Sequence, residues 1–496
     1  MIYLYKKLSC LKFIYMILFA LAGLFVTYLA YSYFKPHYKD IKYQNKKDVP
    51  TVKGGYPLIG HGLEFSKDVL GFMEKCYQDY GKIFKINVFG LNMTMVCDRN
   101  LVVQLLKEKE DNLSLYDVFD RILFFDSFMS NTKDKFEYMK IIREVITLNF
   151  NAFMPKIKSE AQRMVSNLSN KIKINNKVNL TDEMKKFIIN TSAQCFTKLD
   201  DNLTDEFISN LNKFSDIVNK TITLSSFLPK WLLCNTIIKY GNIYKNKLIA
   251  SLNDEIEKYR QDPDKTDSIL FRKAVDHENK YSNQQIGEML LILLYASAEN
   301  TALGLTATLI ELSRDKDMWQ KVHDECTKHI KNNDDLESVF KSPIVDACMT
   351  EALRLNSHIF GITRKPIALK TLGDYYIGDC DSVAVSTALL MSGTCANDLY
   401  KEPKKYDPAR FLEPRFEKKT SDGIINFSAY LHNCPGKQFA IYEIKTALAY
   451  FIVNFERFDI SDSDYNTKQL CSTAVIPERN SVVELQLSEL KEISKN

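Results

Sequence analysis

The longest uninterrupted helical pattern in the chain, residues 282–314, constrains its fold more than any other feature. It contains no proline, and Ser282 followed by Gln285 three residues later forms a capping box, a common helix start. A helix of this length would extend over about 50 Å, at about 1.5 Å per residue. Its middle, residues 290–298, is apolar on all sides, so it must be buried on every face. Only a large helical domain can surround such a helix.

Three polar residues, Glu299, Asn300 and Thr301, stand directly after this apolar stretch. A charged or polar side chain in the centre of a buried helix is costly unless it has a partner. The turn is therefore a candidate functional position. The alternative is that it only faces a groove or a salt bridge.

Composition indicates a globular protein in a reducing compartment. With 496 residues, 45% of them hydrophobic and 12% aromatic, the chain can build a large core. The net charge of +4 is small and the charges are interspersed, which gives no sign of nucleic-acid binding. The 11 cysteines include no Cys-x-x-Cys pair, and the 7 histidines include no His-x-x-x-His pair. We therefore expect neither a disulfide framework nor a zinc ribbon, and no zincin-type hydrolase.

The pattern along the chain predicts a mainly helical domain with small peripheral sheets. Residues 82–89 and 93–97 alternate like the two strands of a hairpin. Residues 101–341 carry helical spacing with few prolines or glycines. Short strands follow at 367–385 and 481–487.

The N-terminal region predicts a membrane anchor. Residues 13–34 contain no charge, and these 22 residues would extend over about 33 Å as a helix, enough to cross a bilayer. A cleaved signal peptide is the alternative, but its apolar core is normally shorter. Lysines are more numerous after the segment than before it, which favours a cytosolic position for the rest of the chain. The predicted organisation is a short tail at 1–12, the anchor at 13–34, a linker at 35–60 and one domain at 61–496.

Glu351 and Arg354 predict a charge network. Their spacing of three places an acid and a base on one face of a helix. Alone such a pair says little, because surface pairs at this spacing are common. Here the apolar segment 356–364 follows, and Arg410 comes later beside Phe411. Together these residues suggest a buried network of one glutamate and two arginines.

Cys434 lies where a loop, residues 427–436, meets a good helical stretch. At such a junction free backbone N–H groups and the helix N-terminus favour a thiolate. A thiolate is a soft metal ligand, although most cysteines of intracellular proteins are only small buried hydrophobic residues. Cys434 is therefore a candidate metal ligand.

The loop resembles the haem loop of the cytochrome P-450 superfamily, the haem-thiolate oxygenases. The family pattern is Phe-x-x-Gly-x-x-x-Cys-x-Gly, and Phe427, Cys434 and Gly436 match it in order. The resemblance runs from about Pro57 to the C-terminus. It implies the cytochrome P-450 fold, preceded here by one transmembrane helix.

Two further motifs extend the resemblance. Glu351-x-x-Arg354 resembles the helix pair of the family and Arg410 its third member. Residues 296–301, Ala-Ser-Ala-Glu-Asn-Thr, resemble the oxygen-activation turn, so Glu299, Asn300 and Thr301 are implied to be catalytic.

The resemblance also implies a cofactor, haem b, with Cys434 as the axial ligand of its iron. A cysteine ligand pushes electron density toward the iron and favours O–O cleavage. The haem carboxylates need cations, and three positions resemble those of the family: Arg364, Lys140 and His432. Each of these could instead be an ordinary surface cation.

Two sterol branches of the family compete. Residues 117–121 resemble the substrate-side segment of sterol 14α-demethylases, with Phe119 where those enzymes carry tyrosine. They carry His-Thr where this chain has Glu299 and Asn300, and that turn looks more like sterol 7α-hydroxylases and prostacyclin synthase. A sterol or another bulky lipid is the implied substrate. The aromatic and apolar residues of 113–129 either pack against other helices or form the roof of its pocket. The implied pocket residues are Phe119, Leu123, Phe124, Ala296, Ile359 and Phe360.

The chain departs from the family at two positions. Tyr430 stands where the haem loop has glycine, a residue that lets the backbone approach the haem and tolerates φ > 0. Either the loop shifts or the tyrosine points away. Asn300 replaces the usual threonine, so proton delivery must use another arrangement of this turn.

The resemblance implies a membrane-anchored monooxygenase that oxidises a sterol-like lipid with O₂. Its electrons would come from NADPH through a flavoprotein reductase, and its domain would face the cytosol from a membrane of endoplasmic-reticulum type in a eukaryotic host. Two alternatives remain open at this point. One is an isomerase of lipid peroxides that needs neither O₂ nor reductase, and the other is a haem-binding lipid sensor without turnover.

Overall fold

The computed structural model describes most of the chain, in two compact units. Besides Gly23, Thr27, Lys39 and Leu228, the described residues are 41–57, 59–122, 125–130, 135–148, 150–196, 205–225, 230–262, 281–333, 335–356, 361–417, 424–460 and 482–488. Residues 1–124, 219–239 and 363–385 form the first, here called the sheet unit. Residues 125–218, 240–362 and 386–496 form the second, the helical unit.

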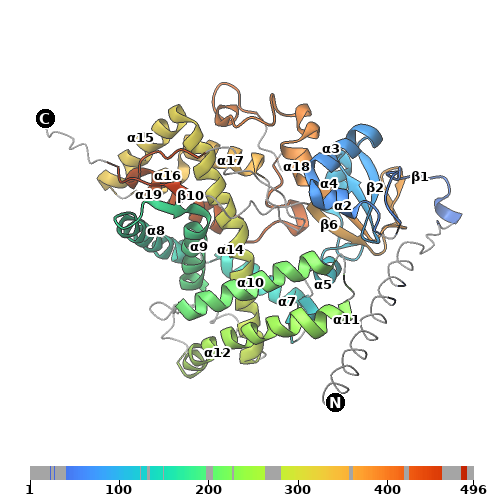
Figure 1. Ribbon diagram of the computed structural model, residues 1–496, viewed down its shortest axis with the longest axis horizontal. Helices are drawn as coiled ribbons and strands as arrows, with labels where there is room; N and C mark the ends of the chain where they lie inside the picture. The colour runs from blue at the N-terminus through green and yellow to red at the C-terminus, as the bar shows by residue number, and fades with distance from the viewer. Residues whose placement is uncertain are drawn as a thin grey trace, which may run out of the picture. The chain divides into compact units, whose positions relative to one another are not determined.

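The sheet unit is built around a five-stranded sheet (Figure 1). Its strands, in spatial order, are β2 (Ile83–Val88), β3 (Leu91–Val96), β9 (Ser382–Ser386), β6 (Gly361–Pro366) and β4 (Leu113–Ser114). β2 and β3 form the antiparallel hairpin that the sequence predicts, joined by Phe89 and Gly90 at φ 50° and 82°. β3 pairs in parallel with β9, which begins within the predicted strand region 367–385.

Short elements complete this unit. Its other sheet has the order β1 (Lys47–Asp48), β8 (Tyr375–Tyr376) and β7 (Thr371–Leu372). The helices are α2 (Gly62–Lys67), α3 (Val69–Tyr80), α4 (Arg99–Lys107), α5 (Tyr116–Ile122) and α11 (Lys230–Leu233), with a 3₁₀ turn η1 (Ile41–Tyr43) and a π-helical turn η2 (Cys234–Ile238).

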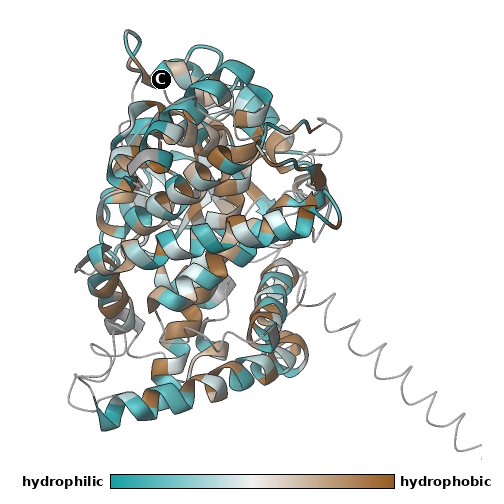
Figure 2. Ribbon diagram, turned by 90° about the vertical axis from the view of Figure 1, so that its left-hand side faces the viewer, coloured by the Kyte–Doolittle hydropathy of each residue, from teal (hydrophilic) through white to brown (hydrophobic). Residues whose placement is uncertain are grey.

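Long helices make up the helical unit, and most carry polar and apolar residues side by side (Figures 1 and 2). They are α7 (Lys135–Leu148), α8 (Phe150–Ile172), α9 (Leu180–Phe196), α10 (Asp205–Ser225), α12 (Lys239–Gln261), α14 (Asn283–Arg314), α15 (Lys316–Asn333), α17 (Pro343–Leu355) and α19 (Lys437–Asn454). Shorter elements are α6 (Phe125–Phe128), α16 (Leu336–Lys341), α18 (Thr387–Met391), η4 (Thr394–Asp398), η5 (Pro408–Phe411), η6 (Tyr430–His432) and the antiparallel pair of β5 (Lys177–Asn179) with β10 (Val482–Glu484). The predicted class, mainly helical with small sheets, is confirmed.

α14 is the long helix that the sequence predicts, and it packs against α9, α17 and α19. Ser282 caps its start: the Ser282 hydroxyl accepts a bond from Gln285 N–H at 3.3 Å, and the Gln285 side chain accepts one from Ser282 N–H at 2.8 Å. Of the residues that the structure describes, this helix alone is long and apolar enough to cross a membrane, and 67% of its apolar window is buried inside the protein.

The expectation that α14 is buried on every face is wrong at one stripe. Residues less buried than their neighbours recur every three to four positions, on one side of the helix. They are Ile292, Tyr295, Ala296, Ser297, Glu299 and Asn300. The apolar side chains of this stripe therefore line accessible space, because other side chains do not close over them.

α19 follows Cys434 and runs through the core, with every residue from 442 to 453 buried. Glu443 has 0% exposure, and neither carboxylate oxygen has a hydrogen-bond partner in the described part of the chain. Burial raises the pKa of Glu443 well above its ordinary value of 4.5. The folded protein therefore holds the proton more tightly than the unfolded chain does.

Glu443→Gln should stabilise the protein, by an amount that grows with pH. Because the folded-state pKa is raised, the wild type loses about 1.4 kcal/mol of unfolding free energy per pH unit above about pH 4.5, whereas a neutral amide loses none. Urea unfolding of both proteins at several pH values between about 5 and 7 measures the difference. Glu484→Gln, at a side chain that is 61% exposed, is the control and should show no such trend. A constant difference across this pH range would contradict the account.

Candidate functional site

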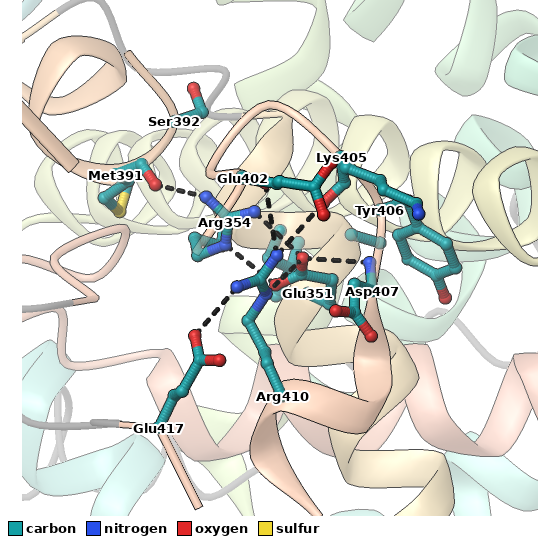
Figure 3. Close-up of polar contacts among 12 residues, drawn as sticks. Glu351, Arg354, Met391, Ser392, Glu402, Lys405, Tyr406, Asp407, Arg410 and Glu417 are labelled. Carbon is teal, nitrogen blue, oxygen red and sulfur yellow. Dashed lines mark hydrogen bonds and ion pairs between the residues drawn. The ribbon is translucent and has the colours of Figure 1, made fainter. Parts of the chain in front are cut away.

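Glu351 is the centre of a buried charge network in the helical unit (Figure 3). From the same turn of α17, Arg354 Nε donates to Glu351 Oε2 at 2.7 Å and Nη2 to Oε1 at 2.9 Å. From η5, Arg410 Nε donates to Glu351 Oε1 at 2.8 Å. All three side chains are fully buried. The structure thus brings together the three residues that the sequence suggested.

Arg410 and Glu351 make further hydrogen bonds. Arg410 Nη1 donates to Glu417 Oε2 at 2.8 Å, and Asp407 N–H donates to Glu351 Oε1 at 3.1 Å. Burial by itself would lower the pKa of Arg410, but Glu351 and Glu417 outweigh it and raise that pKa above its ordinary value. The ring of Tyr400 lies 5.0 Å from Arg354 Cζ and 5.6 Å from Arg410 Cζ, a cation–π arrangement.

The network is connected to the segment that enters the Cys434 loop. Arg354 Nη1 donates to Met391 O, and the Met391 sulfur accepts a bond from Ile425 N–H at 3.3 Å. Asn426 Nδ2 donates to Leu353 O, at the end of α17, at 2.6 Å. The network therefore sets the direction in which the chain approaches the loop.

Cys434 is held between a reverse turn and the start of α19. Its N–H donates to Phe427 O at 2.8 Å, which closes the loop, and a Cβ added to Gly436 would lie 3.9 Å from its Sγ. The Phe427 ring lies 5.9 Å from Lys437 Nζ. Among the described residues no three or more His, Cys, Asp or Glu side chains gather into a metal site.

Several opposing influences act on the pKa of the Cys434 thiol. Burial raises the pKa of the thiol, while the Gly436 N–H, Arg143 and Lys437 act to lower it, and the net direction is upward. This differs from the sequence expectation of a junction that favours the thiolate, because burial outweighs the helix N-terminus. A metal that replaces the thiol proton would reverse the balance, since ligands bind metals in their deprotonated form.

Tyr430 occupies the left-handed region that its family position implies. Its φ is 58°, and that of Ser428 is 55°. The Tyr430 side chain is 39% exposed, so it points toward the surface rather than into the core. A non-glycine residue in this region costs about 1–2 kcal/mol. The loop thus keeps the backbone turn that glycine would provide and accepts the strain.

Arg143 is a cation at this loop that sequence reasoning missed. From α7 its Nη1 donates to Asn433 Oδ1 at 2.8 Å and its Nη2 to Asn433 O at 3.1 Å. The candidate Lys140, one turn earlier on the same helix, is exposed. His432 lies half-buried in η6. A second cation at spacing three from Lys140 was the available signal for Arg143.

The three polar residues of the α14 turn, 299–301, have different surroundings. Glu299 forms an ion pair with Lys185 of α9, and both side chains are mostly buried. Thr301 is buried, whereas Asn300 is exposed on the accessible stripe together with Ala296, one turn before it. Lys185 is a second residue that sequence reasoning missed.

Arg364 lies on β6 in the sheet unit and is 2% exposed. Among the residues that the structure describes, its one hydrogen bond runs from Nη1 to Thr363 O at 3.0 Å. Burial lowers its pKa to about 10, although Glu110 opposes this. A buried guanidinium is suited to bind an anion such as a carboxylate.

Several predicted pocket residues lie outside what the structure describes. Leu123, Phe124, Ile359 and Phe360 are among the residues that are not described, and Phe119 lies in α5 without a described side chain.

Comparison with known proteins identifies relatives over most of the chain. A family model described as "Cytochrome P450" matches residues 50–484. A protein of Acanthamoeba polyphaga mimivirus, named "Probable lanosterol 14-alpha demethylase", is 40% identical over 446 residues, which are 88% of this chain and 62% of that protein. This chain therefore spans less than two thirds of that relative's length. "Sterol 14-demethylase" of Arabidopsis thaliana is 24% identical, over 88% of this chain and 90% of that protein.

Two solved structures share the fold. "Retinoic acid bound cyanobacterial CYP120A1" superposes with a TM-score of 0.72 at 21% identity, over 89% of this chain and 100% of that one. "Crystal structure of cytochrome P450DA heme domain" gives 0.70 at 18% identity, over 90% and 99%. These likenesses concern the fold.

Glu351→Gln should destabilise the protein by about 3–5 kcal/mol, because it leaves two buried guanidinium groups without their shared carboxylate. Urea unfolding measures the change. Glu337→Gln is the matched control, since Glu337 also pairs with a cation, Lys341, but both side chains are 70% exposed. If the two variants lose similar stability, the network is not the constraint described here.

Tyr430→Gly should raise the unfolding free energy by about 1 kcal/mol, because glycine adopts a positive φ without strain. Tyr430→Ala keeps the strain and should bring no gain. Leu431→Gly, in the same 3₁₀ turn and 55% exposed, should lower stability, since glycine there adds only flexibility. A Tyr430→Gly protein less stable than the wild type would refute the strain.

Proposed function

This chain belongs to the cytochrome P450 family, and on that premise we propose that it is a haem-thiolate monooxygenase that oxidises a sterol or a similarly bulky lipid. The observation that carries the proposal is the setting of Cys434 at the start of α19. Its thiol contacts Gly436, lies in the field of Arg143 and Lys437, and follows a segment tied to the buried Glu351 network.

The residues present fit a haem. A haem with a cysteine ligand needs one accessible sulfur and cations for its two carboxylates. Cys434 would supply the sulfur, and Arg364, which is 2% exposed in the sheet unit, is the cation that the family resemblance implies. His432 and either Lys140 or Arg143 are the further candidates. When bound, the haem would supply the iron chemistry that activates O₂.

The chain's own residues would deliver protons. In the proposed reaction one oxygen atom of O₂ enters the substrate and the other leaves as water, with two electrons and two protons consumed. Glu299, held in place by its ion pair with Lys185, and the Thr301 hydroxyl are the proposed proton-delivery residues of this turn. Asn300 on the accessible stripe would orient water by its amide, in place of the usual threonine hydroxyl.

Relatives favour one substrate branch. The mimivirus relative at 40% identity is named a probable lanosterol 14-alpha demethylase, which supports 14-demethylation over 7-hydroxylation of a sterol. The apolar part of the accessible stripe on α14, which includes Ile292 and Ala296, suits a bulky apolar substrate. Phe119, Leu123, Phe124, Ile359 and Phe360 stay the pocket residues that the family resemblance predicts.

We also propose that residues 13–34 anchor the protein in a membrane and that residues 61–496 form the cytosolic catalytic domain behind a linker at 35–60. The proposal rests on the length and apolar composition of this segment. Electrons would come from an NADPH-dependent flavoprotein reductase in the same membrane.

The absorption spectrum of the reduced, carbon-monoxide-bound protein tests the proposal. The full-length wild type should give the Soret band of a thiolate-ligated haem, because Cys434 is the proposed ligand. Cys434→Ser should lose it, whereas Cys395→Ser, at another buried cysteine, should keep it. Lanosterol should then shift the spectrum of the ferric wild type. A band that persists in Cys434→Ser would overturn the assignment.

A further inference from the structure

A buried polar cluster joins α12 and α14 to the short stretch Phe128–Ser130 of the helical unit. Its members are Lys245, Glu288 and Ser130. We propose that this cluster fixes the carboxyl-terminal end of residues 113–129, the segment assigned to the pocket roof, and so determines the affinity for a bulky substrate. The inference rests on the proposed function, and it makes Lys245, Glu288 and Ser130 positioning residues rather than catalytic ones.

The carboxylate of Glu288 is fully occupied. Its Oε1 accepts hydrogen bonds from Lys245 Nζ at 3.0 Å and from Gln284 Nε2 at 2.7 Å. Its Oε2 accepts bonds from the backbone N–H of Ser130 at 2.9 Å and from its hydroxyl at 2.8 Å. The Glu288 side chain has 0% exposure, so these four bonds replace its hydration.

Both charges of the pair bind backbone groups of one short stretch. Lys245 Nζ donates to Phe128 O at 2.8 Å, two residues before the Ser130 N–H that Glu288 accepts. The Lys245–Glu288 pair therefore not only joins α12 to α14 but also binds the carbonyl of Phe128 and the amide of Ser130. Breaking either bond frees this backbone.

Packing around Phe128 fixes the same stretch from the other side. Its ring makes an edge-to-face contact with Phe214 of α10, with centroids 5.6 Å apart. A Cβ added to Gly241 of α12 would lie 3.0 Å from Phe128 Cε1, so the ring lies against the helix backbone. Asn242 Nδ2 donates to Ser127 O at 3.4 Å. The stretch is therefore anchored by apolar and polar contacts together.

Stability alone does not account for a buried ion pair. Replacing such a pair by apolar residues of similar volume is often neutral or stabilising, because the desolvation cost disappears. Apolar residues cannot, however, hold the Phe128 carbonyl and the Ser130 amide in place. α14 continues from Glu288 to Ala296 on the accessible stripe, eight residues and about 12 Å further along. The cluster therefore sets the position of the anchored stretch relative to that stripe.

The double variant Lys245→Met/Glu288→Met separates positioning from stability. It should unfold at about the wild-type urea concentration, yet bind lanosterol about tenfold more weakly in a spectral titration, which corresponds to about 1.4 kcal/mol. Imidazole, a small ligand of haem iron that needs no pocket roof, should bind within about twofold of the wild type. Ser130→Ala, a milder change, should weaken lanosterol binding in the same direction.

A matched control is available in the same unit. Lys445 also donates to a phenylalanine carbonyl, that of Phe340, at 2.8 Å, and pairs with Asp346 at 2.8 Å. Lys445→Met/Asp346→Leu should leave the affinity for lanosterol unchanged. Loss of affinity in both double variants alike would overturn the proposal, as would unchanged lanosterol binding in Lys245→Met/Glu288→Met or a parallel loss of imidazole binding.

Amide hydrogen exchange decides the anchoring without a haem signal. Residues 126–130 should exchange faster in Lys245→Met/Glu288→Met than in the wild type, with α19 unchanged. Unaltered exchange would refute the anchor even if the proposed function holds. A wild type with no thiolate Soret band and no response to lanosterol would instead refute the proposed function, and the exchange result would still test the anchor.

Discussion

The rest of the helical unit depends on the burial of Glu351 between two arginines. One fully buried carboxylate accepts bonds from Arg354, Arg410 and the Asp407 N–H. Such an arrangement is costly to assemble and more costly to break, so it allows one relative position of α17 and η5. Hydrogen bonds from residues 425–426 to Met391 and Leu353 connect the network to the segment that leads into the Cys434 loop.

The Cys434 loop carries two features that are unfavourable for folding. Burial raises the pKa of the Cys434 thiol, and the positive φ of Ser428 and Tyr430 strains the backbone around it. Neither cost favours folding by itself, and both are typical of a site whose geometry serves a ligand. The network supplies the rigidity that holds the loop in this form. A metal bound at the sulfur would recover part of the cost of burying it, because the bound form is the thiolate.

Sequence reasoning predicted what local patterns encode. The capping box and the apolar run predicted the bounds of α14. The alternation of apolar and polar residues predicted the β2–β3 hairpin. The motif pattern predicted that Glu351, Arg354 and Arg410 form one network. It did not find Arg143, Lys185 or the Lys245–Glu288 pair. These partners come from helices far apart in sequence, and each residue alone is an ordinary surface type. The accessible stripe on α14 was missed because composition does not distinguish a side chain covered by the rest of the protein from one that stays accessible.

Iron-edge X-ray absorption of the haem-loaded, full-length protein tests the central claim most directly, because it identifies the atoms bound to the iron. The account predicts one sulfur ligand in the wild type and none in Cys434→Ser. A wild type whose iron has only nitrogen and oxygen neighbours, or a sulfur ligand that survives in Cys434→Ser, would contradict it.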